Sequence, residues 1–298
     1  MMTPTWSDPD LRHRLAAIRM CALDVDGTLL NSRHEISPET REAVHAAQAA
    51  GLEVLLASSR GPSAMRPVLD ALDAPAGSSF VASHGAVVGS LDGAGQLRVT
   101  AQRPLPLGDG LAVLRLARAL GLSVGWYSGS SWLVDALDPA IAVEASITRC
   151  SPTVTDLSRQ ATGPDKLMLI AAPGEVHLLT LVVEHLGPNL HGQISNPTYL
   201  EITATGVDKA SAITAYRQDL GFESHHVLAM GDGPNDLGMF AVAGLSVAPA
   251  NARPQVLEAA DAVSPANDDN GVAWVLTRLI SARARELDSA AGRRAMPS

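Results

Sequence analysis

The sequence predicts an α/β fold in which a doubly wound parallel sheet carries an inserted α+β domain. Toward both ends of the chain, short apolar runs alternate with helical segments, a pattern typical of parallel sheets. Between these two regions the pattern changes to hairpin-like strand pairs mixed with helices. Several apolar runs also end abruptly in carboxylate or hydroxyl side chains, as expected at the carboxyl edge of an open α/β sheet, where ligands bind.

Residues 15–87 are expected to form the first part of the parallel domain. Ser37 and Pro38 are typical of a helix start, and Gly51 is typical of a helix end. The preceding residues 1–14 are polar and are expected to form a loose N-terminal arm. The expected elements are strands over residues 20–23, 52–57 and 80–83, and helices over residues 37–50 and 62–72.

Residues 88–195 are expected to form the inserted α+β domain, and residues 196–298 return to the alternating pattern and complete the parallel domain. In and around the insertion we expect a hairpin over residues 86–90 and 96–100, helices over 111–120, 138–149 and 175–186, and strands over 122–127, 132–134, 166–171, 191–195 and 199–203. In the last part we expect helices over residues 208–219, 235–243 and 272–282, strands over 227–230, 245–248 and 262–263, and a frayed end after about residue 286.

Composition and charge argue against several classes of function. With 298 residues, 46% of them hydrophobic, the chain is globular and long enough for two domains. Its net charge of -9 argues against nucleic acid or an anionic membrane as the main partner, although a metal would allow an anionic small substrate. Cys21 and Cys150 form neither a disulfide framework nor a metal-ligand cluster. There is no signal-peptide pattern and no bilayer-length apolar run, so a soluble cytoplasmic protein is expected.

Two carboxylates, Asp24 and Asp26, follow the apolar run over residues 20–23. Acids this close repel each other, and a bound Mg²⁺ ion would remove the repulsion because it prefers oxygen ligands. One carboxylate could then attack phosphorus as a nucleophile while the other moves a proton. Gly27 lets the backbone turn and approach a ligand closely, and the Thr28 hydroxyl can hold the turn or orient Asp26. The alternative interpretation is a solvated turn, since Asp and Gly are common in turns.

A second acidic loop, with Asp232 and Asp236, follows the apolar run over residues 227–230. Four carboxylates at predicted strand ends would be unstable without a cation. Asn235 adds an amide that can contact phosphate or a metal-bound water. The alternative interpretation of this segment is a Gly-Asp-Gly-Pro turn at a helix start. The presence of two such loops in one chain favours chemistry over turn formation.

Ser58 and Lys209 offer further polar groups at element ends. Ser58 follows the second predicted strand and can donate a hydrogen bond to a phosphate oxygen, or it is a simple loop residue. Lys209 stands at a predicted helix start, where its ammonium and the backbone amides can stabilise a carboxylate nucleophile and phosphoryl charge. The alternative for Lys209 is a solvated surface lysine.

Taken together, these segments resemble the four motifs of the haloacid dehalogenase superfamily. Their order and spacing are similar to those of its Cof-type phosphatases, which implies a Rossmann-like core with a class II, subtype B cap between motifs two and three. The similarity covers most of the core, whereas the cap matches in length and element type. The matching segments are Asp24-Val25-Asp26-Gly27-Thr28-Leu29, Ser58 with Arg60, Lys209, and Gly231-Asp232-Gly233-Pro234-Asn235-Asp236.

The resemblance implies catalytic roles for Asp24, Asp26 and Lys209. Asp24 would be the nucleophile that forms an aspartyl-phosphate. Asp26 would protonate the leaving alkoxide and then activate water. Lys209 would stabilise the nucleophile and the phosphoryl oxygens.

The resemblance also implies a Mg²⁺ cofactor and a phosphate-binding set. The implied metal ligands are Asp24, Asp26 through its backbone carbonyl, Asp232 and, in support, Asp236. The implied substrate- or phosphate-binding residues are Gly27, Ser58, Ser59, Arg60, Asn235 and, in the insertion, Lys166.

Two positions depart from the family pattern. Ser59 stands where the family often has glycine, and His84 stands where it usually has asparagine. His84 could contact the substrate or Asp26 and make activity sensitive to pH near neutrality, or it is a loop histidine near the insertion.

Three aromatic residues of the insertion bear on substrate choice. Trp126, Tyr127 and Trp132 could form a wall for a sugar or ring, although aromatic side chains on such strands more often belong to the core.

The sequence therefore predicts a Mg²⁺-dependent phosphatase that hydrolyses a small phosphorylated metabolite, such as a sugar phosphate, through an aspartyl-phosphate. The expected partner is that small molecule, with no nucleic acid or membrane partner, and the chain is expected to be a monomer or homodimer. Two alternatives are a phosphomutase of related fold and a non-catalytic phosphate-binding regulatory protein. The intact set of Asp24, Asp26, Lys209 and Asp232 argues against the second alternative.

Overall fold

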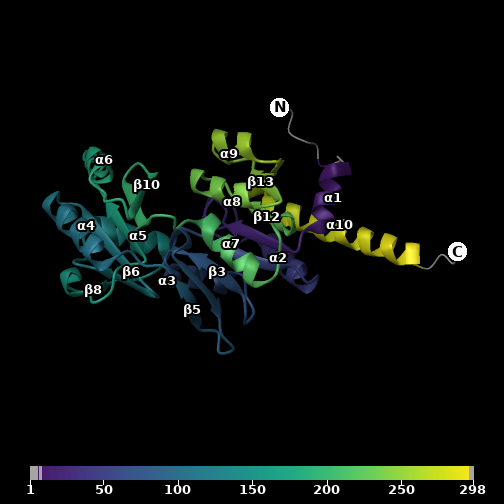
Figure 1. The fold of residues 1–298 in the computed structure, drawn as a ribbon, viewed down its shortest axis with the longest axis horizontal. Coiled ribbons are helices and arrows are strands. Elements are labelled where there is room, and N and C mark those ends of the chain that lie inside the picture. The colour runs from purple at the N-terminus through teal and green to yellow at the C-terminus, as the bar shows by residue number, and fades with distance from the viewer. Residues whose placement is uncertain (1–5, 7–8, 295–298) are drawn as a thin grey trace. The chain divides into compact units, whose positions relative to one another are not determined.

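A computed structural model describes Trp6 and residues 9–294 (Figure 1). The chain forms two compact units. The first unit contains the residues up to Ala57, the short segment Ala71–Asp73 and the residues from Ile213 onward. The second unit contains Ser58–Asp70 and Ala74–Ala212. The expected domain boundaries, after residues 87 and 195, stay a prediction.

The first unit is built on a set of parallel strands, which confirms the predicted fold class. In spatial order these are β14 (Ala262–Ser264), β13 (Leu245–Pro249), β12 (Val227–Met230), β1 (Met20–Asp24) and β2 (Glu53–Ala57). Every pair of neighbours within this set is parallel. All residues of β1 and β12 are buried, as in sheets that are covered on both faces. Their apolar runs therefore specify central strands.

Helices cover this sheet. Figure 1 shows α8 (Leu237–Val242) and α9 (Pro254–Ala259) on one side of β12 and β13, and α1 (Pro9–Ala17) and α10 (Gly271–Arg294) on the other. The helix α2 (Pro38–Ala49) packs against α10 and begins as its sequence predicts, with the Ser37 hydroxyl accepting a hydrogen bond of 3.0 Å from the Thr40 amide. The helix α7 (Lys209–Asp219) starts in the second unit and ends in the first.

The expected loose N-terminal arm is wrong for the part of residues 1–14 that the structure describes. Residues 9–14 belong to α1, and its residues Leu11 and Leu15 are 2% and 3% exposed. Because they are four residues apart, they form one apolar stripe of the helix. The Arg14 guanidinium donates to the Gly244 carbonyl and to Asp261 Oδ2, at 2.6 and 2.8 Å from Nη2. Helix α1 is thus an integral part of the first unit.

The expected frayed end after about residue 286 is also wrong for the residues up to Arg294, because α10 continues to that residue, and the rest of the expected end lies outside the described residues. The segment over residues 281–294 is rich in alanine and arginine, both strong helix formers. Helical propensity extends the helix past the last apolar residues that mark its packed part.

The second unit contains an antiparallel meander, a six-stranded sheet and the helices around them. One sheet segment is an antiparallel meander of β3 (Ser79–Ala82), β4 (Val87–Leu91) and β5 (Leu97–Gln102). The other sheet has the order β10 (Leu190–Asn196), β11 (Tyr199–Ala204), β9 (Lys166–Ile170), β6 (Ser123–Ser128), β7 (Ser131–Val134) and β8 (Thr153–Val154). The helices of this unit are α3 (Pro62–Ala71), α4 (Leu107–Ala119), α5 (Pro139–Thr148) and α6 (His177–Glu184).

The three aromatic residues of the second sheet belong to its core. Trp126, Tyr127 and Trp132 are 0%, 4% and 3% exposed, and the rings of Tyr127 and Trp132 stack with centroids 5.7 Å apart. The core interpretation of these side chains is therefore correct, and the alternative, a wall facing a substrate, is wrong.

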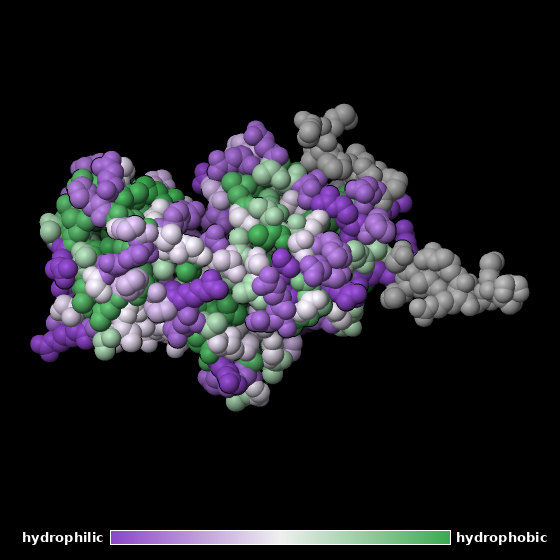
Figure 2. Space-filling view, viewed as in Figure 1, coloured by the Kyte–Doolittle hydropathy of each residue, from purple (hydrophilic) through white to green (hydrophobic). Residues whose placement is uncertain are grey.

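The surface mixes hydrophilic and hydrophobic residues. Figure 2 shows hydrophobic residues on the visible face of the second unit, near α4, α6 and β10. Val176 and Ile194, at the start of α6 and on β10, are among the large apolar side chains that reach solvent, with 37% and 46% exposure. Within the described part of the chain, every helix is too short or too polar to cross a lipid bilayer.

The Arg14–Asp261 contact predicts a pH-dependent contribution to stability. Burial alone would raise the pKa of Asp261, but hydrogen bonds from Arg14 and Ser246 lower it below the ordinary value. A lowered pKa stabilises the fold above the ordinary value of about 3.9, and this stabilisation is lost as the pH falls through the folded-state pKa. We expect Asp261→Asn to lower the free energy of unfolding at neutral pH and to differ little from the wild type at strongly acidic pH, measured by urea unfolding.

The matched control is Glu35→Gln, which removes an exposed partner of Arg33 and should change stability little at any pH. Equal unfolding free energies of Asp261→Asn and the wild type at neutral pH would contradict this account.

Candidate metal and phosphate site

The pairing of β1 with β12 brings the two acidic loops together. The strands are parallel and Leu23 is aligned with Met230. Asp24 ends β1, and Asp232 lies two residues after the end of β12, so both side chains reach the same carboxyl edge of the sheet. This confirms the expectation that distant strand ends deliver their acids to one place.

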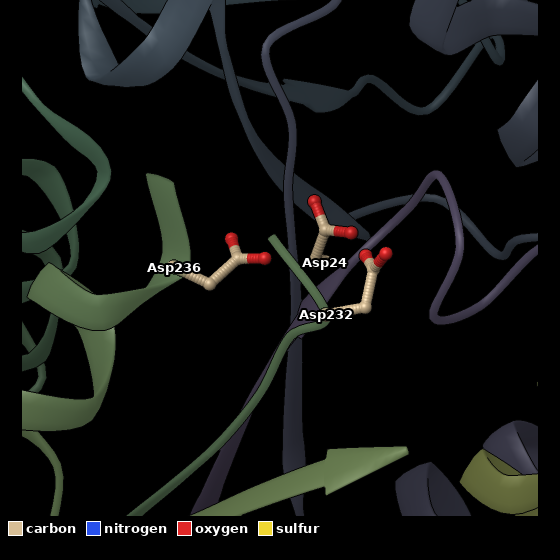
Figure 3. Close-up of side chains that lie close together, drawn as sticks. All are labelled: Asp24, Asp232 and Asp236. Atoms are coloured by element: carbon tan, nitrogen blue, oxygen red, sulfur yellow. The ribbon is translucent and has the colours of Figure 1, made fainter. Parts of the chain in front are cut away.

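Three carboxylates form a cluster at this edge. Asp24, Asp232 and Asp236 each offer an oxygen atom, and these oxygens lie within 4.8 Å of one another. Figure 3 shows the Asp236 carboxylate directed toward the other two. Asp24 and Asp236 are 5% and 0% exposed, so this negative charge is largely removed from water. Asp236 is held by the Gly233 amide, which donates to its Oδ2 at 3.0 Å.

The loop after β1 is shaped to meet Asp232. Gly27 has a φ of +81°, in the left-handed region, and a Cβ atom there would lie 2.5 Å from Asp232 Oδ2. Only glycine fits a site with that backbone and that contact. The Thr28 hydroxyl donates to Asp232 Oδ1 at 3.4 Å. Both residues therefore define the position of the Asp232 carboxylate.

Two asparagines that the sequence analysis did not assign to the site brace the same loop. Asn251 donates from Nδ2 to the Gly27 carbonyl at 2.8 Å, and Asn267 donates from Nδ2 to the Leu30 carbonyl at 2.9 Å. The Asn267 amide in turn donates to Asn251 Oδ1 at 2.9 Å. Both follow parallel strands, β13 and β14, so their position after strand ends was a usable signal.

The acidic cluster has the donor set of a divalent cation site. Three buried or half-buried carboxylates this close repel one another, and a cation removes the repulsion. All ligand atoms are hard oxygens, as preferred by Mg²⁺ and Ca²⁺. The side chains of Asp24, Asp232 and Asp236 are therefore able to hold such an ion.

Asp26 is two residues from Asp24, but its carboxylate is not part of this cluster. Its carboxylate is 41% exposed, and Asp26 Oδ1 lies 3.7 Å from His34 Nδ1. The sequence analysis missed His34, because a single histidine in a polar loop carries no pattern. Asn235 is half-buried, and its side chain folds over Gly233, where an added Cβ would lie 2.5 Å from Asn235 Oδ1.

The remaining predicted residues, Ser58, Ser59, Arg60, Lys166 and Lys209, lie in the second unit. Lys209 is the first residue of α7 and is 1% exposed, so the alternative of a solvated surface lysine is wrong. Ser58 is also 1% exposed. The functional roles of these five residues stay predictions.

Comparison with known proteins identifies the family. The sequence model of haloacid dehalogenase-like hydrolases matches residues 21–276. The chain belongs to this family. It is therefore an enzyme, a hydrolase, and the resemblance indicated by the four motifs is confirmed. A solved structure of a haloacid dehalogenase-like hydrolase from Bacteroides thetaiotaomicron superimposes with a TM-score of 0.79 at 28% identity, covering 88% of this chain and 99% of that one.

Two curated relatives of this haloacid dehalogenase-like hydrolase have phosphatase names. The 5-amino-6-(5-phospho-D-ribitylamino)uracil phosphatase YcsE of Bacillus subtilis is 30% identical over 267 residues, covering 87% of this chain and 96% of the relative. The HMP-PP phosphatase of Cronobacter sakazakii is 28% identical over 241 residues, covering 80% of this chain and 86% of the relative. The two names give different substrates.

Replacement of Asp232 should separate metal binding from folding. We expect Asp232→Asn to weaken Mg²⁺ binding by more than about tenfold, the range found when even supporting groups of metal sites are removed. Without metal, the variant should be at least as stable as the wild type, because one of three repelling charges is gone. Calorimetric Mg²⁺ titration and thermal unfolding with and without a chelator measure both effects.

Asp73→Asn is the control, since Asp73 is a 69% exposed partner of Arg41 in the same unit. It should leave Mg²⁺ affinity unchanged. An Asp232→Asn protein that binds Mg²⁺ as the wild type does would rule out the proposed cluster as the metal site.

Proposed function

We propose that this haloacid dehalogenase-like hydrolase is a Mg²⁺-dependent phosphatase that hydrolyses a small phosphorylated metabolite through an aspartyl-phosphate. The observation that carries the proposal is the cluster of Asp24, Asp232 and Asp236 at the carboxyl edge of the parallel sheet. The phosphatase names of the two relatives support the reaction class.

Asp24 is the proposed nucleophile. Its carboxylate oxygen attacks phosphorus, a bond forms between that oxygen and phosphorus, and the bond from phosphorus to the substrate oxygen breaks. Asp26 gives a proton to the leaving alkoxide. In the second half-reaction Asp26 takes a proton from water, the water oxygen attacks phosphorus, and the bond to Asp24 breaks to release phosphate. Exposure of the Asp26 carboxylate is consistent with proton exchange with solvent.

The other residues of the proposed site supply charge and hydrogen bonds. Mg²⁺, when bound, supplies positive charge that offsets the charge of the phosphoryl oxygens. Asp24, Asp232, Asp236 and the Asp26 carbonyl would be its protein ligands. The proposed phosphoryl contacts come from Gly27, Ser58, Ser59, Arg60, Asn235 and Lys209. Positioning and charge stabilisation account for most of the catalysis of such phosphoryl transfers.

The proposed substrate class is a small phosphomonoester, such as a sugar phosphate. The relatives do not narrow this class, because their names give two different substrates. Trp126, Tyr127 and Trp132 are buried, so they supply no aromatic wall for a substrate ring.

Replacement of the nucleophile tests the mechanism. We expect Asp24→Asn to lower kcat by about 10³-fold or more, because the amide cannot form the phosphoryl ester, while the thermal unfolding temperature stays near that of the wild type. Release of inorganic phosphate from a panel of phosphomonoesters with Mg²⁺ is the measurement. Asp73→Asn is again the control and should retain full turnover.

The same assay decides between the functional classes. Release of free phosphate without a bisphosphate activator identifies a phosphatase, whereas isomerisation of the substrate that depends on such an activator identifies a phosphomutase. Ordinary turnover by Asp24→Asn would refute the proposed nucleophile.

A further inference from the structure

A buried carboxylate in the second unit lies between two basic side chains. Glu201 of β11 is 5% exposed. Its Oε1 accepts a hydrogen bond of 2.5 Å from Lys166 Nζ, and its Oε2 lies 2.6 Å from His84 Nε2. Lys166 and His84 are 2% and 6% exposed. One carboxylate thus joins β9 and β11 to the turn that follows β3.

Lys166 connects Glu201 to residues 58–61, which we call the Ser58 loop. Lys166 Nζ donates to the Ser59 carbonyl at 2.8 Å. That carbonyl and the Arg60 amide belong to one planar peptide unit, so fixing the first fixes the direction of the second. The Arg60 amide donates to Ser58 Oγ at 3.1 Å. A hydroxyl that accepts such a bond becomes a better donor through its own hydrogen.

His84 connects Glu201 to the same loop by a second route. Ser83, His84 and Gly85 follow one another in the left-handed region, with φ of 50°, 57° and 107°. Such conformations are strained for residues other than glycine and persist only where surrounding contacts hold them. The bond between His84 and Glu201 is one such contact.

This strained turn holds two further carbonyls of the Ser58 loop. The Ser83 amide donates to the Arg60 carbonyl at 2.7 Å, and the His84 amide donates to the Ser58 carbonyl at 3.2 Å. Because Lys166 donates to the Ser59 carbonyl, three consecutive carbonyls of the loop accept hydrogen bonds. The donors are the two partners of Glu201, Lys166 and His84, and the residue before His84.

Packing leaves the loop little freedom to compensate. A Cβ atom on Gly61 would lie 2.5 Å from the ring of Tyr127, so the backbone rests directly on that ring. Lys166 Nζ lies 4.7 Å from the centroid of the same ring. The ammonium group is therefore enclosed by Glu201, Tyr127 and the loop itself.

The charges around Glu201 stabilise its ionised form. Burial would raise the pKa of Glu201, but the charges and hydrogen bonds of His84 and Lys166 outweigh burial and hold the pKa well below its usual range. Glu201 is thus ionised at neutral pH. Buried ion pairs are rarely more stabilising than apolar packing, so the presence of this one fits a role in fixing geometry.

We propose that Glu201, acting through Lys166 and His84, is a positioning residue that sets the Ser58 loop for binding a phosphoryl group. This inference rests on the proposed function of the loop, and it assigns Lys166 to the loop backbone instead of the substrate. In this scheme Glu201 contacts no reacting atom. It acts on Ser58 through Lys166 and the peptide unit between Ser59 and Arg60.

The test separates the ion pair from the loop contact. Lys166→Met removes the donor to Ser59 and leaves the Glu201 charge with one partner fewer, so the unfolding temperature should fall. The double variant Lys166→Met/Glu201→Gln removes both charges and should recover much of that stability. In both proteins the Ser59 carbonyl lacks its donor, so inorganic phosphate should bind about ten- to a hundredfold more weakly in the presence of Mg²⁺.

Two measurements report the phosphate affinity and the local stability of the Ser58 loop. Calorimetric titration with inorganic phosphate gives its affinity, and hydrogen exchange resolved to the Arg60 amide reports the loop whether or not the enzyme turns over. The exchange should be faster in both variants than in the wild type. The control is Asp165→Asn: Asp165 is 1% exposed, lies in the same unit and accepts hydrogen bonds from the Gly129 amide and from Gln102. It should change only the unfolding temperature.

Each outcome decides one of the two proposals. A double variant that binds phosphate and protects the Arg60 amide as the wild type does would overturn the positioning role while leaving the phosphatase proposal intact. A wild type that binds no phosphate and hydrolyses no phosphomonoester would refute the proposed function, and the Arg60 exchange would still show whether Lys166 and Glu201 set the loop.

Discussion

The parallel pairing of β1 with β12 is the constraint on which the rest of the site depends. Because both strands run in the same direction and are buried along their whole length, their acidic ends meet at one edge. Like charges that meet in this way are unfavourable unless something compensates them. The neighbouring groups fix the loop geometry: Gly27 leaves space for the Asp232 carboxylate, and Asn251 donates a hydrogen bond to the Gly27 carbonyl. The sequence model of the family to which the chain belongs spans both loops.

Much of the fold could be predicted because it is recorded in local patterns. The runs that form β1 and β12 are apolar without interruption and are followed by acids and glycine. This pattern is typical of a central strand in a parallel sheet. Helix α1 was not predicted, because its two buried leucines are separated by polar residues. Its partners, such as Gly244 and Asp261, also lie more than 200 residues away in the sequence. The end of α10 was not predicted, because helical propensity alone, without an apolar stripe, extends this helix.

The candidate site divides in the same way. The cluster of Asp24, Asp232 and Asp236 was predictable, since Asp24 ends a recognisable strand and the other two acids lie in the loop that follows another. Glu201 was not, because one acid inside a strand pattern reads as a solvent-facing residue, and its partner His84 lies 117 positions away. His34 was equally hidden. Sequence patterns show which residues stand at strand ends, whereas buried pairs between distant elements become visible only in three dimensions.

The strained turn Ser83–Gly85 has a consequence for how the protein folds. Left-handed conformations at Ser83 and His84 cost roughly 1–3 kcal/mol each, and Glu201 supplies one of the contacts that offset this cost. That contact cannot form before Glu201, 117 residues after His84, has been synthesised. The Ser58 loop is synthesised earlier in the chain, so it lacks this contact until Glu201 is in place. Catalytic competence should then be among the last properties the chain acquires, after most of its secondary structure, because contacts between residues far apart in sequence form slowly.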